Sequence, residues 1–222
     1  MRCENMSNLY IIAGEIGVGK TNFTINFAKN LAKTQKITLI DLDTSNLYFR
    51  LSELKDEIKC ENINMILPQF ANLTQEVPSL SGAVESALRD VTQTVIVDTP
   101  GGDFGITILS RYRDLIKARN AQILYVINKF RAGIETAEKA ATTLKSFENA
   151  TNLKVTNLIN NSHLGNFTTI EDMQKSAEYA KSVSEICKIN LLYNCVSENF
   201  AENVQARIEN IFPIKIIGGG RL

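Results

Sequence analysis

Residue types that mark several specialised protein classes are scarce in this chain of 222 residues. It holds no tryptophan, one histidine, four cysteines and four prolines. Collagen-like chains and disulfide scaffolds need far more Gly, Pro or Cys, so both classes are excluded. A zinc site is also disfavoured, because no two cysteines form a C-x-x-C pair and His163 has no second histidine to join it. We therefore expect reduced, mostly buried thiols in a cytoplasmic protein.

Net charge and long apolar segments are lacking as well. The 24 Lys and Arg residues balance 24 Asp and Glu residues, so no bulk positive charge is present to hold nucleic acid. No apolar run reaches about 18 residues, and Glu15 interrupts the short apolar stretch near the N-terminus, unlike a secretory signal. Pro213 and three glycines predict a strand and tail at the C-terminus rather than an amphipathic membrane helix. We predict neither a nucleic-acid partner nor a membrane partner.

Short apolar runs of strand length recur along the chain. They are rich in Ile, Val and Leu and show no polar alternation, which is typical of strands buried on both faces in a parallel sheet. The runs are Leu9–Ala13, Ile37–Ile40, Val95–Val97, Ile123–Ile127 and Val155–Ile159. We expect each to form a strand, and the hydrophobic fraction of 44% supplies an ample core.

Apolar residues at helical spacing fill segments between these runs. The spacing predicts helices over 23–31, 134–144 and 170–180, the last preceded by Thr169 and Asp172 in the pattern of a capping box. Alternating strands and helices predict an α/β fold, a doubly wound and mostly parallel sheet flanked by helices on both faces. We expect one domain, residues 1–222, with an irregular insertion or lid at about 45–81 and a tail at about 213–222.

A glycine-rich motif lies between the first strand and the first helix. Residues 14–21 read Gly-Glu-Ile-Gly-Val-Gly-Lys-Thr and fit the phosphate-binding pattern G-x-x-x-x-G-K-[ST]. Glycines let successive backbone N–H groups face the phosphates, and the helix N-terminus adds positive potential. Lys20 is expected to bridge the β- and γ-phosphates, and the Thr21 hydroxyl to ligate Mg²⁺. The residues expected to hold the nucleotide here are Gly14, Glu15, Ile16, Gly17, Val18, Gly19, Lys20, Thr21 and Asn22.

Three aspartates follow the second and third predicted strands. Asp41 and Asp43 end the second strand, and alternation sends both carboxylates in the same direction. Asp98 ends the third, and all three should meet the phosphate loop at the carboxyl ends of the strands. We assign Asp98 to Mg²⁺ through water, Asp41 to the same hydration shell, and Asp43 to the attacking water. Gly101 and Gly102 could offer N–H groups to the γ-phosphate and flex as a switch loop does.

Taken in order, these motifs resemble the MinD/ParA/CobQ-type nucleotide-binding proteins, a branch of the P-loop NTPases. They are G-x-x-G-V-G-K-T at 14–21, I-T-L-I-D-L-D at 37–43 and V-I-V-D-T-P-G-G at 95–102. The chain is more similar still to an uncharacterised bacterial ATP-binding subgroup with D-L-D-x-x-N-x-Y-F-R, here 41–50, and N-N-x-x-L-G, here 160–165. The wider resemblance implies an ATPase that dimerises around bound nucleotide, whereas the subgroup implies no particular biological task.

One position departs from the wider family. Most members carry a second lysine early in the loop, which reaches the phosphates of a partner subunit. Here Glu15 occupies that position and Ile16 the next. A carboxylate repels phosphate, so the usual trans-lysine arrangement for hydrolysis is in doubt while nucleotide binding is not. Our hypothesis is that another cation substitutes, with Arg50 or Lys129 as the candidates.

The base is predicted from two asparagine-bearing strand ends. Asn128 and Lys129 resemble the guanine motif N-K-x-D, but Arg131 stands where guanine needs an acid, so adenine is favoured. Asn161 matches the family's base-contacting asparagine, with Asn160 as the less favoured choice. We expect His163 to be an ordinary loop residue.

These inferences lead to a magnesium-dependent ATP-binding protein, a slow ATPase that acts as a nucleotide-dependent switch. Its cofactors would be ATP and Mg²⁺, with Lys20 and Asp43 as catalytic residues and Thr21, Asp41 and Asp98 at the metal. Its partners would be ATP or ADP, a second copy in a nucleotide-dependent homodimer, and an unidentified protein. Two alternatives stay open, a non-hydrolysing nucleotide sensor or adaptor and an ATP-dependent synthetase of the CobQ/CobB type.

Overall fold

The structure, a computed structural model, describes residues 8–43, 58, 61–67 and 78–217. Within them, eight strands form one sheet in the order β3-β2-β4-β1-β5-β6-β7-β8, and every neighbouring pair is parallel. The strands are β1 (Leu9–Gly14), β2 (Ile37–Asp41), β3 (Ile63–Ile66), β4 (Thr94–Asp98), β5 (Gln122–Ile127), β6 (Asn157–Asn160), β7 (Asn190–Ser197) and β8 (Ile211–Ile214). The predicted parallel α/β sheet is therefore confirmed, while the prediction of one domain over the whole chain stays a prediction.

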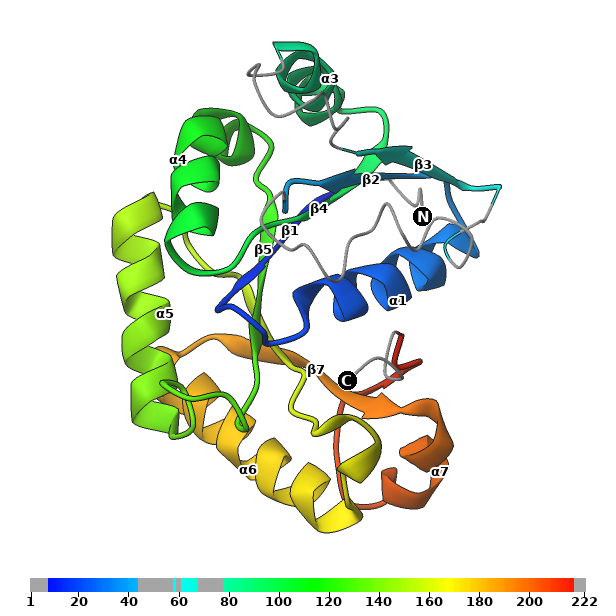
Figure 1. Cartoon of the computed structure of the whole chain (residues 1–222), viewed down its shortest axis with the longest axis vertical. Helices are drawn as coiled ribbons and strands as arrows, with labels where there is room; N and C mark the ends of the chain where they lie inside the picture. The colour runs from blue at the N-terminus through cyan, green and yellow to red at the C-terminus, as the bar shows by residue number, and fades with distance from the viewer. Residues whose placement is uncertain (1–7, 44–57, 59–60, 68–77, 218–222) are drawn as a thin grey trace, which may run out of the picture.

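Helices cover both faces of this sheet (Figure 1). They are α1 (Lys20–Ala32), α3 (Pro78–Arg89), α4 (Gly102–Ala118), α5 (Ala137–Thr151), α6 (Ile170–Cys187) and α7 (Ala201–Val204). Helix α1 lies on one side, and α4 and α5 lie on the other, with α3 against α4 and α6 against α5. Helix α6 begins with the predicted capping box, in which Thr169 and Asp172 bond reciprocally. None of the helices in the described part of the chain is long and apolar enough to cross a bilayer.

An aromatic cluster packs helix α1 against strands β1 and β8. The rings of Phe23 and Phe27 stack at 5.4 Å, and Phe212 of β8 meets the ring of Phe23 at 5.8 Å. Tyr10 of β1 meets Phe27 edge-on at 5.0 Å. Each buried ring stabilises the fold by about 1.5–3 kcal/mol, so α1 and the loop before it rest on a fixed base.

Two strands lie where the sequence pattern gave no strand signal. Strand β3 falls inside the segment of about 45–81 that was expected to be an irregular insertion or lid. Residues 45–57, 59–60 and 68–77 of that segment lie outside the described part of the chain. Strand β3 pairs only with β2 at the sheet edge, and its exposed Asn64 breaks the apolar run. Strand β7 carries polar residues and is only partly buried. Both lack the continuous apolar pattern that identified the central strands.

Two element boundaries differ from the sequence-based prediction. Helix α5 begins at Ala137, after Thr136 accepts a bond from the Lys139 N–H, so Ile134 belongs to the preceding loop. Strand β6 begins at Asn157, although the buried Val155 lies just before it. In both cases a buried apolar residue outside the element extends the hydrophobic pattern beyond its true start.

The order of the strands reverses at β1, in the interior of the sheet. Strand β1 lies between β4 and β5, so the chain crosses to one side of β1 early and to the other side later. The ends of β1, β2 and β4 meet at this point, with Asp41 in register with Asp98. Parallel sheets bind ligands at such a reversal of strand order, beyond the carboxyl ends of the strands.

Candidate functional site

The phosphate loop connects β1 to α1, and it leaves no room for a side chain at Gly19. This residue is the N-cap of α1 and has φ 85°, a left-handed conformation that glycine adopts without strain. A Cβ atom there would lie 2.3 Å from Nδ2 of Asn161, which is wholly buried. Helix α1 begins at this loop without a side-chain cap on its N-cap residue, and a helix N-terminus of this kind favours a bound anion.

Lys20 lies within the loop that it is expected to serve. Its side chain is almost wholly buried, and Nζ donates to the backbone carbonyl of Glu15 at 2.9 Å. Burial lowers the pKa of Lys20, while the carboxylates of Asp98, Asp43 and Glu15 act in the opposite direction. The ammonium group is thus held among acids and backbone oxygens at the mouth of the loop, where a phosphate could replace the carbonyl as its partner.

Asp98 and Asp43 act on the charge of Lys20, and Asp41 lies in register with Asp98 on the neighbouring strand. Asp98 is fully buried, and its Oδ1 accepts a bond from the Thr24 hydroxyl at 3.1 Å. Burial raises the pKa of Asp98 to about 6, against the opposing effects of the Thr21 hydroxyl and Lys20. Asp43 raises the pKa of both Asp98 and Lys20, so it lies close to them. Asp41 accepts a bond from the N–H of Asp43 at 2.9 Å.

The donor set at this edge fits Mg²⁺ bound together with a nucleotide. Asp98 has one buried oxygen, Oδ2, without a hydrogen-bond partner among the described residues, and the Thr21 hydroxyl lies nearby. In the part of the chain that the structure describes, no three His, Cys, Asp or Glu residues could hold a metal by themselves. Mg²⁺ needs no such cluster, because it keeps waters and is bound by one or two protein oxygens plus phosphates.

Glu15 is directed into the fold, on the side of the sheet that carries α4. Its Oε2 lies 4.0 Å from the position that a Cβ on Gly102 would take, at the first residue of α4. Burial and, after it, the Glu15 carboxylate raise the pKa of the Tyr125 hydroxyl on β5. A carboxylate is favoured near the N-terminus of a helix, which gives Glu15 a local reason to lie there.

The loop also contacts the predicted switch segment directly. A Cβ on Gly101 would lie 2.6 Å from the backbone nitrogen of Ile16, so glycine is required for this close approach. Ile16 itself is 72% exposed, and Phe104 near the start of α4 is 67% exposed. The two segments that should sense the γ-phosphate therefore touch each other, and both carry an exposed apolar side chain.

Asn161 bonds to the phosphate loop. Its Nδ2 donates to the carbonyls of Val18 at 2.9 Å and Gly19 at 3.3 Å. The less favoured Asn160 instead belongs to a buried network, in which Nδ2 donates to Oδ1 of Asn194 at 2.7 Å. The side chain of Asn128 turns back on its own loop, where Oδ1 accepts a bond from the N–H of Phe130 at 3.0 Å.

Among the described residues, Arg131 is a cation that lies against the phosphate loop, and the sequence-based hypothesis did not name it. Its guanidinium carbon lies 3.3 Å from the position that a Cβ on Gly17 would take. Of the two candidates named, Arg50 lies outside the described residues. The ammonium of Lys129 lies 5.3 Å from the ring centroid of Tyr179 on α6, in a cation–π contact. Arg131 was visible in the sequence only as the residue that breaks the guanine motif.

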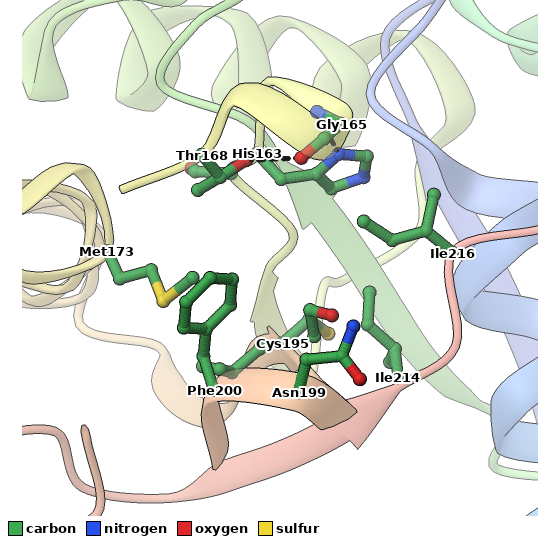
Figure 2. A pocket seen from close by; sticks show the side chains of 12 residues that line it. His163, Gly165, Thr168, Met173, Cys195, Asn199, Phe200, Ile214 and Ile216 are labelled. Atoms are coloured by element: carbon green, nitrogen blue, oxygen red, sulfur yellow. Dashed lines mark hydrogen bonds between the residues drawn. The ribbon is translucent and has the colours of Figure 1, made fainter. Parts of the chain in front are cut away.

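His163 is another residue whose position the sequence did not indicate. Burial, and then the Arg131 charge, lower the pKa of His163, whose Nε2 lies 3.7 Å from the position of a Cβ on Gly19. The same imidazole borders a cavity of about 290 Å³ (Figure 2). Its walls come from segments far apart in the chain, and they include Met173, Cys195, Phe200, Ile214 and Ile216. No local motif could have predicted a cavity assembled in this way.

Buried polar atoms without partners gather near the loop. Among the described residues, Nδ2 of Asn22, Oδ1 of Asn161 and Nε2 of His163 have no hydrogen-bond partner. Asn22 lies in the first turn of α1, where its Oδ1 accepts a bond from Asn26 and leaves Nδ2 available. Buried unpaired groups are rare in native proteins, and their concentration beside one loop points to a ligand that pairs with them.

Comparison with known proteins adds a family and a shared fold. The sequence pattern of the CobQ/CobB/MinD/ParA nucleotide binding domain matches residues 9–199. Among proteins with curated descriptions, none matches the chain. FtsY from Mycoplasma mycoides superposes with a TM-score of 0.58 at 17% identity, covering 85% of this chain and 60% of that one. The chain thus spans less than two thirds of that protein.

Two further solved structures share the fold. Chloroplast FtsY from Physcomitrella patens has a TM-score of 0.58 at 18% identity, covering 83% of this chain and 57% of that one. Signal recognition particle 54 kDa protein from Aeropyrum pernix K1, in complex with GDP, has a TM-score of 0.52 at 16% identity. That match covers 86% of this chain and 41% of the other. At these identities the likeness concerns the fold alone.

Proposed function

Because this chain belongs to the CobQ/CobB/MinD/ParA nucleotide-binding family, we propose that it is a cytoplasmic, magnesium-dependent ATP-binding protein. It hydrolyses ATP slowly, and its nucleotide state switches the interaction with a partner protein. The observation that carries this proposal is the convergence of Lys20 with Asp98 and Asp43 at the mouth of a glycine-lined loop. Such a set binds a triphosphate and a divalent cation together.

Each residue of the set has a role in this proposal. The N–H groups of residues 14–19 bind the phosphates, and Lys20 Nζ exchanges the Glu15 carbonyl for phosphate oxygens. Thr21 and Asp98 hold Mg²⁺, and Asp41 orients its hydration shell. Mg²⁺, when bound, supplies charge neutralisation at the phosphates. Asp43 accepts a hydrogen bond from the attacking water and aligns it with the γ-phosphate.

Adenine is the base in this proposal. One structural neighbour binds GDP, but at 16% identity it carries no base preference over to this chain. Support for adenine comes from Arg131, which stands where the guanine motif needs an acid and lies against the loop at Gly17. Asn161 directly follows β6 and bonds to the loop, and in this proposal its side-chain amide hydrogen-bonds to the base. Nδ2 of Asn22 donates a hydrogen bond to the α-phosphate.

The partner includes a second copy of this chain, bound when ATP is bound. Ile16 and Phe104 support this proposal, because both are large, apolar and exposed beside the loop and the start of α4. These two side chains form an exposed apolar surface next to the proposed site of the γ-phosphate. Because bound nucleotide would change the position of the loop, it would also change the surface that a partner contacts. Mixing with Mg²⁺-ATP should shift the protein from monomer to dimer in light scattering, and Phe104→Ser should prevent the shift.

A non-hydrolysing sensor is the second candidate, and the position of Glu15 favours it. The family's second lysine would act on a partner's phosphate, whereas this carboxylate lies at Gly102 and near Tyr125. Steady-state phosphate release distinguishes the two candidates. Turnover above that of an Asp43→Asn variant supports the ATPase, and equal turnover supports the sensor.

Isothermal titration with Mg²⁺-ATP tests nucleotide binding itself. We expect binding by the wild-type protein and at least about a hundredfold weaker binding by Lys20→Ala, because the β- and γ-phosphates lose their cation. Lys33→Ala is the matched control, since Lys33 follows the end of α1 and is exposed. Equal ATP affinity of Lys20→Ala and Lys33→Ala would overturn the proposal.

A further inference from the structure

The guanidinium of Arg131 lies flat against the phosphate loop at Gly17. Its central carbon, Cζ, lies 3.3 Å from the position that a Cβ on Gly17 would take, and Nε and Nη1 lie at 3.4 and 3.5 Å. An approach along an edge of the group would bring nitrogen closer than carbon, so the contact is made by the flat face. The N–H bonds of a guanidinium all lie in its plane, and the contact with Gly17 therefore uses none of them.

The fold does not neutralise the charge of Arg131. Among the described residues, no hydrogen bond or ion pair engages the guanidinium, and the side chain is exposed. Its charge acts on His163, whose pKa is lowered by burial and then by Arg131. A guanidinium without a partner, held beside a loop that binds phosphates, can donate two parallel hydrogen bonds to phosphate oxygens.

A hydrogen-bonded turn places Arg131 at this position. The carbonyl of Asn128 accepts a bond from the Arg131 N–H at 3.1 Å, and Oδ1 of Asn128 accepts from the Phe130 N–H at 3.0 Å. The N–H of Lys129 donates to the hydroxyl of the buried Ser162 at 2.8 Å, which ties the turn to the segment after β6. Asn128 is itself buried, so its amide builds the turn from which Arg131 extends.

Hydrolysis of a triphosphate redistributes negative charge among the phosphates. The oxygen of a water forms a bond to the γ-phosphorus, the bond from that phosphorus to the bridging oxygen breaks, and ADP leaves with the bonding electron pair. One proton of the water stays on the released phosphate and the other goes to solvent. A cation held at the phosphates stabilises the transition state of this step.

We propose that Arg131 is such a cation and that it acts within its own subunit, held by the turn at Asn128. This inference rests on the proposed ATPase, and it names the group that replaces the second lysine of the wider family. That lysine reaches the phosphates of a partner subunit, whereas Arg131 lies against the loop of its own chain. Hydrolysis therefore does not need a second copy, and the ATP-dependent dimer takes no part in the chemistry.

The rate of a single turnover at different protein concentrations tests this inference. Protein is kept in excess over Mg²⁺-ATP and above the dissociation constant for ATP. The rate constant should stay within about twofold when the protein is diluted about a hundredfold, because a group that acts in cis is not lost when copies separate. A rate constant that falls as light scattering shows the dimer dissociating would overturn the inference.

Mixing Arg131→Ala with Lys20→Ala gives a second result, which does not depend on dissociation of the dimer. In a mixed dimer, the Arg131→Ala subunit binds ATP, and the Lys20→Ala subunit carries an intact Arg131. We expect the mixture to hydrolyse ATP no faster than the sum of the two separate rates. Recovery toward the wild-type rate would show that Arg131 acts across the interface, and the inference would be wrong.

Asn128→Ala tests whether Asn128 acts through Arg131. The single-turnover rate should fall by about 5- to 50-fold in Arg131→Ala and by a similar factor in Asn128→Ala. The double variant should be no slower than Arg131→Ala alone, because both changes remove one interaction. Lys129→Ala, in the same turn, is the matched control, and circular dichroism checks that each variant is folded. Losses that multiply in the double variant would contradict the positioning role of Asn128.

The outcomes distinguish this inference from the proposed function. Wild-type protein that binds no Mg²⁺-ATP overturns both. Wild-type protein that binds ATP without any turnover supports the non-hydrolysing sensor and overturns this inference. Turnover that requires a second copy leaves the proposed ATPase intact and overturns only the role of Arg131 in cis.

Discussion

The side-chain amide of Asn161 donates to the carbonyl oxygen of Val18 at 2.9 Å, although the two residues lie 143 positions apart in the chain. A residue at the end of β6 thereby holds the phosphate loop between β1 and α1. In the proposed site, the residue that follows β6 contacts the base and the loop binds the phosphates. The hydrogen bond from Asn161 to Val18 therefore links the part of the site that binds the base to the part that binds the phosphates.

Gly19→Ala should weaken ATP binding by about tenfold or more and destabilise the fold by roughly 2–4 kcal/mol. The added methyl group is strained at φ 85°, and it would meet the Asn161 amide at 2.3 Å. Asn161 is fully buried and cannot move without losing its bond to Val18. Urea unfolding and ATP titration measure the two effects.

Gly133→Ala is the matched control for this substitution. Gly133 has a similar φ of 88°, but nothing lies within 4 Å of an added Cβ. This variant should show the backbone strain alone, about 1 kcal/mol, with unchanged ATP affinity. Equal losses of stability in the two variants would contradict the contact between Gly19 and Asn161 as the reason for glycine.

Glu15→Gln should raise ATP affinity by about 2- to 5-fold at low ionic strength, because it removes a negative charge beside the loop. The carboxylate is close enough to Lys20 to raise its pKa, so it is close enough to repel a phosphate bound there. The gain should shrink as salt is added, since salt screens the repulsion. Glu178→Gln, at an exposed position on α6, is the control. Weaker binding by Glu15→Gln would show that the carboxylate supports the site.

Arg131→Ala should lower ATP affinity and single-turnover hydrolysis by about 5- to 50-fold, whereas Lys129→Ala should change both by less than about twofold. The guanidinium of Arg131 lies against Gly17 of the loop, and the ammonium of Lys129 lies over Tyr179. Rapid-quench measurement of one turnover with excess protein gives the hydrolysis rate. A larger loss in Lys129→Ala would support the hypothesis that Lys129 is the substituting cation.

His163 should make the protein less stable as the pH falls below about 6.5. The pKa of His163 in the fold lies below its ordinary value because of burial and then the Arg131 charge. The unfolded chain therefore binds the proton first, and acid favours unfolding. Asp98 acts in the opposite direction, because its pKa is raised to about 6 and its contribution to stability is lost as the pH rises through that value.

Comparing the wild-type protein with the His163→Asn variant separates the effect of His163 on the pH dependence of stability from that of Asp98. The free energy of unfolding of His163→Asn, measured in urea, should improve relative to wild type between about pH 7.5 and about pH 5. The contribution of Asp98 is common to both proteins and cancels in this difference. A difference in stability that stays constant over this range would contradict a histidine held neutral by the fold.

The sequence was sufficient for the parts of the site that local patterns encode. The spacing of Gly14, Gly17, Gly19 and Lys20 identifies the loop because each of these positions needs a particular residue type. Asp41 and Asp98 could be placed together because parallel strands with apolar runs end at the same edge of the sheet. These inferences depend only on periodicity and on residues close in sequence.

Other parts of the site depend on contacts between distant segments, which the sequence does not encode locally. Arg131 reaches Gly17, and His163 borders a cavity closed by Ile214 and Ile216. Strand β3 was missed for a related reason, since an edge strand needs no continuous apolar run. Sequence patterns identified the loop, and packing determined which side chains surround it.

A crystal structure with Mg²⁺ and a non-hydrolysable ATP analogue tests the central claim most directly. We expect the triphosphate to lie along residues 14–21, with Lys20 Nζ moved from the Glu15 carbonyl to the β- and γ-phosphates. The same map would show whether a second copy of the chain meets Ile16 and Phe104. An analogue bound elsewhere, or a loop in which Lys20 still donates to Glu15 at saturating nucleotide, would contradict the account.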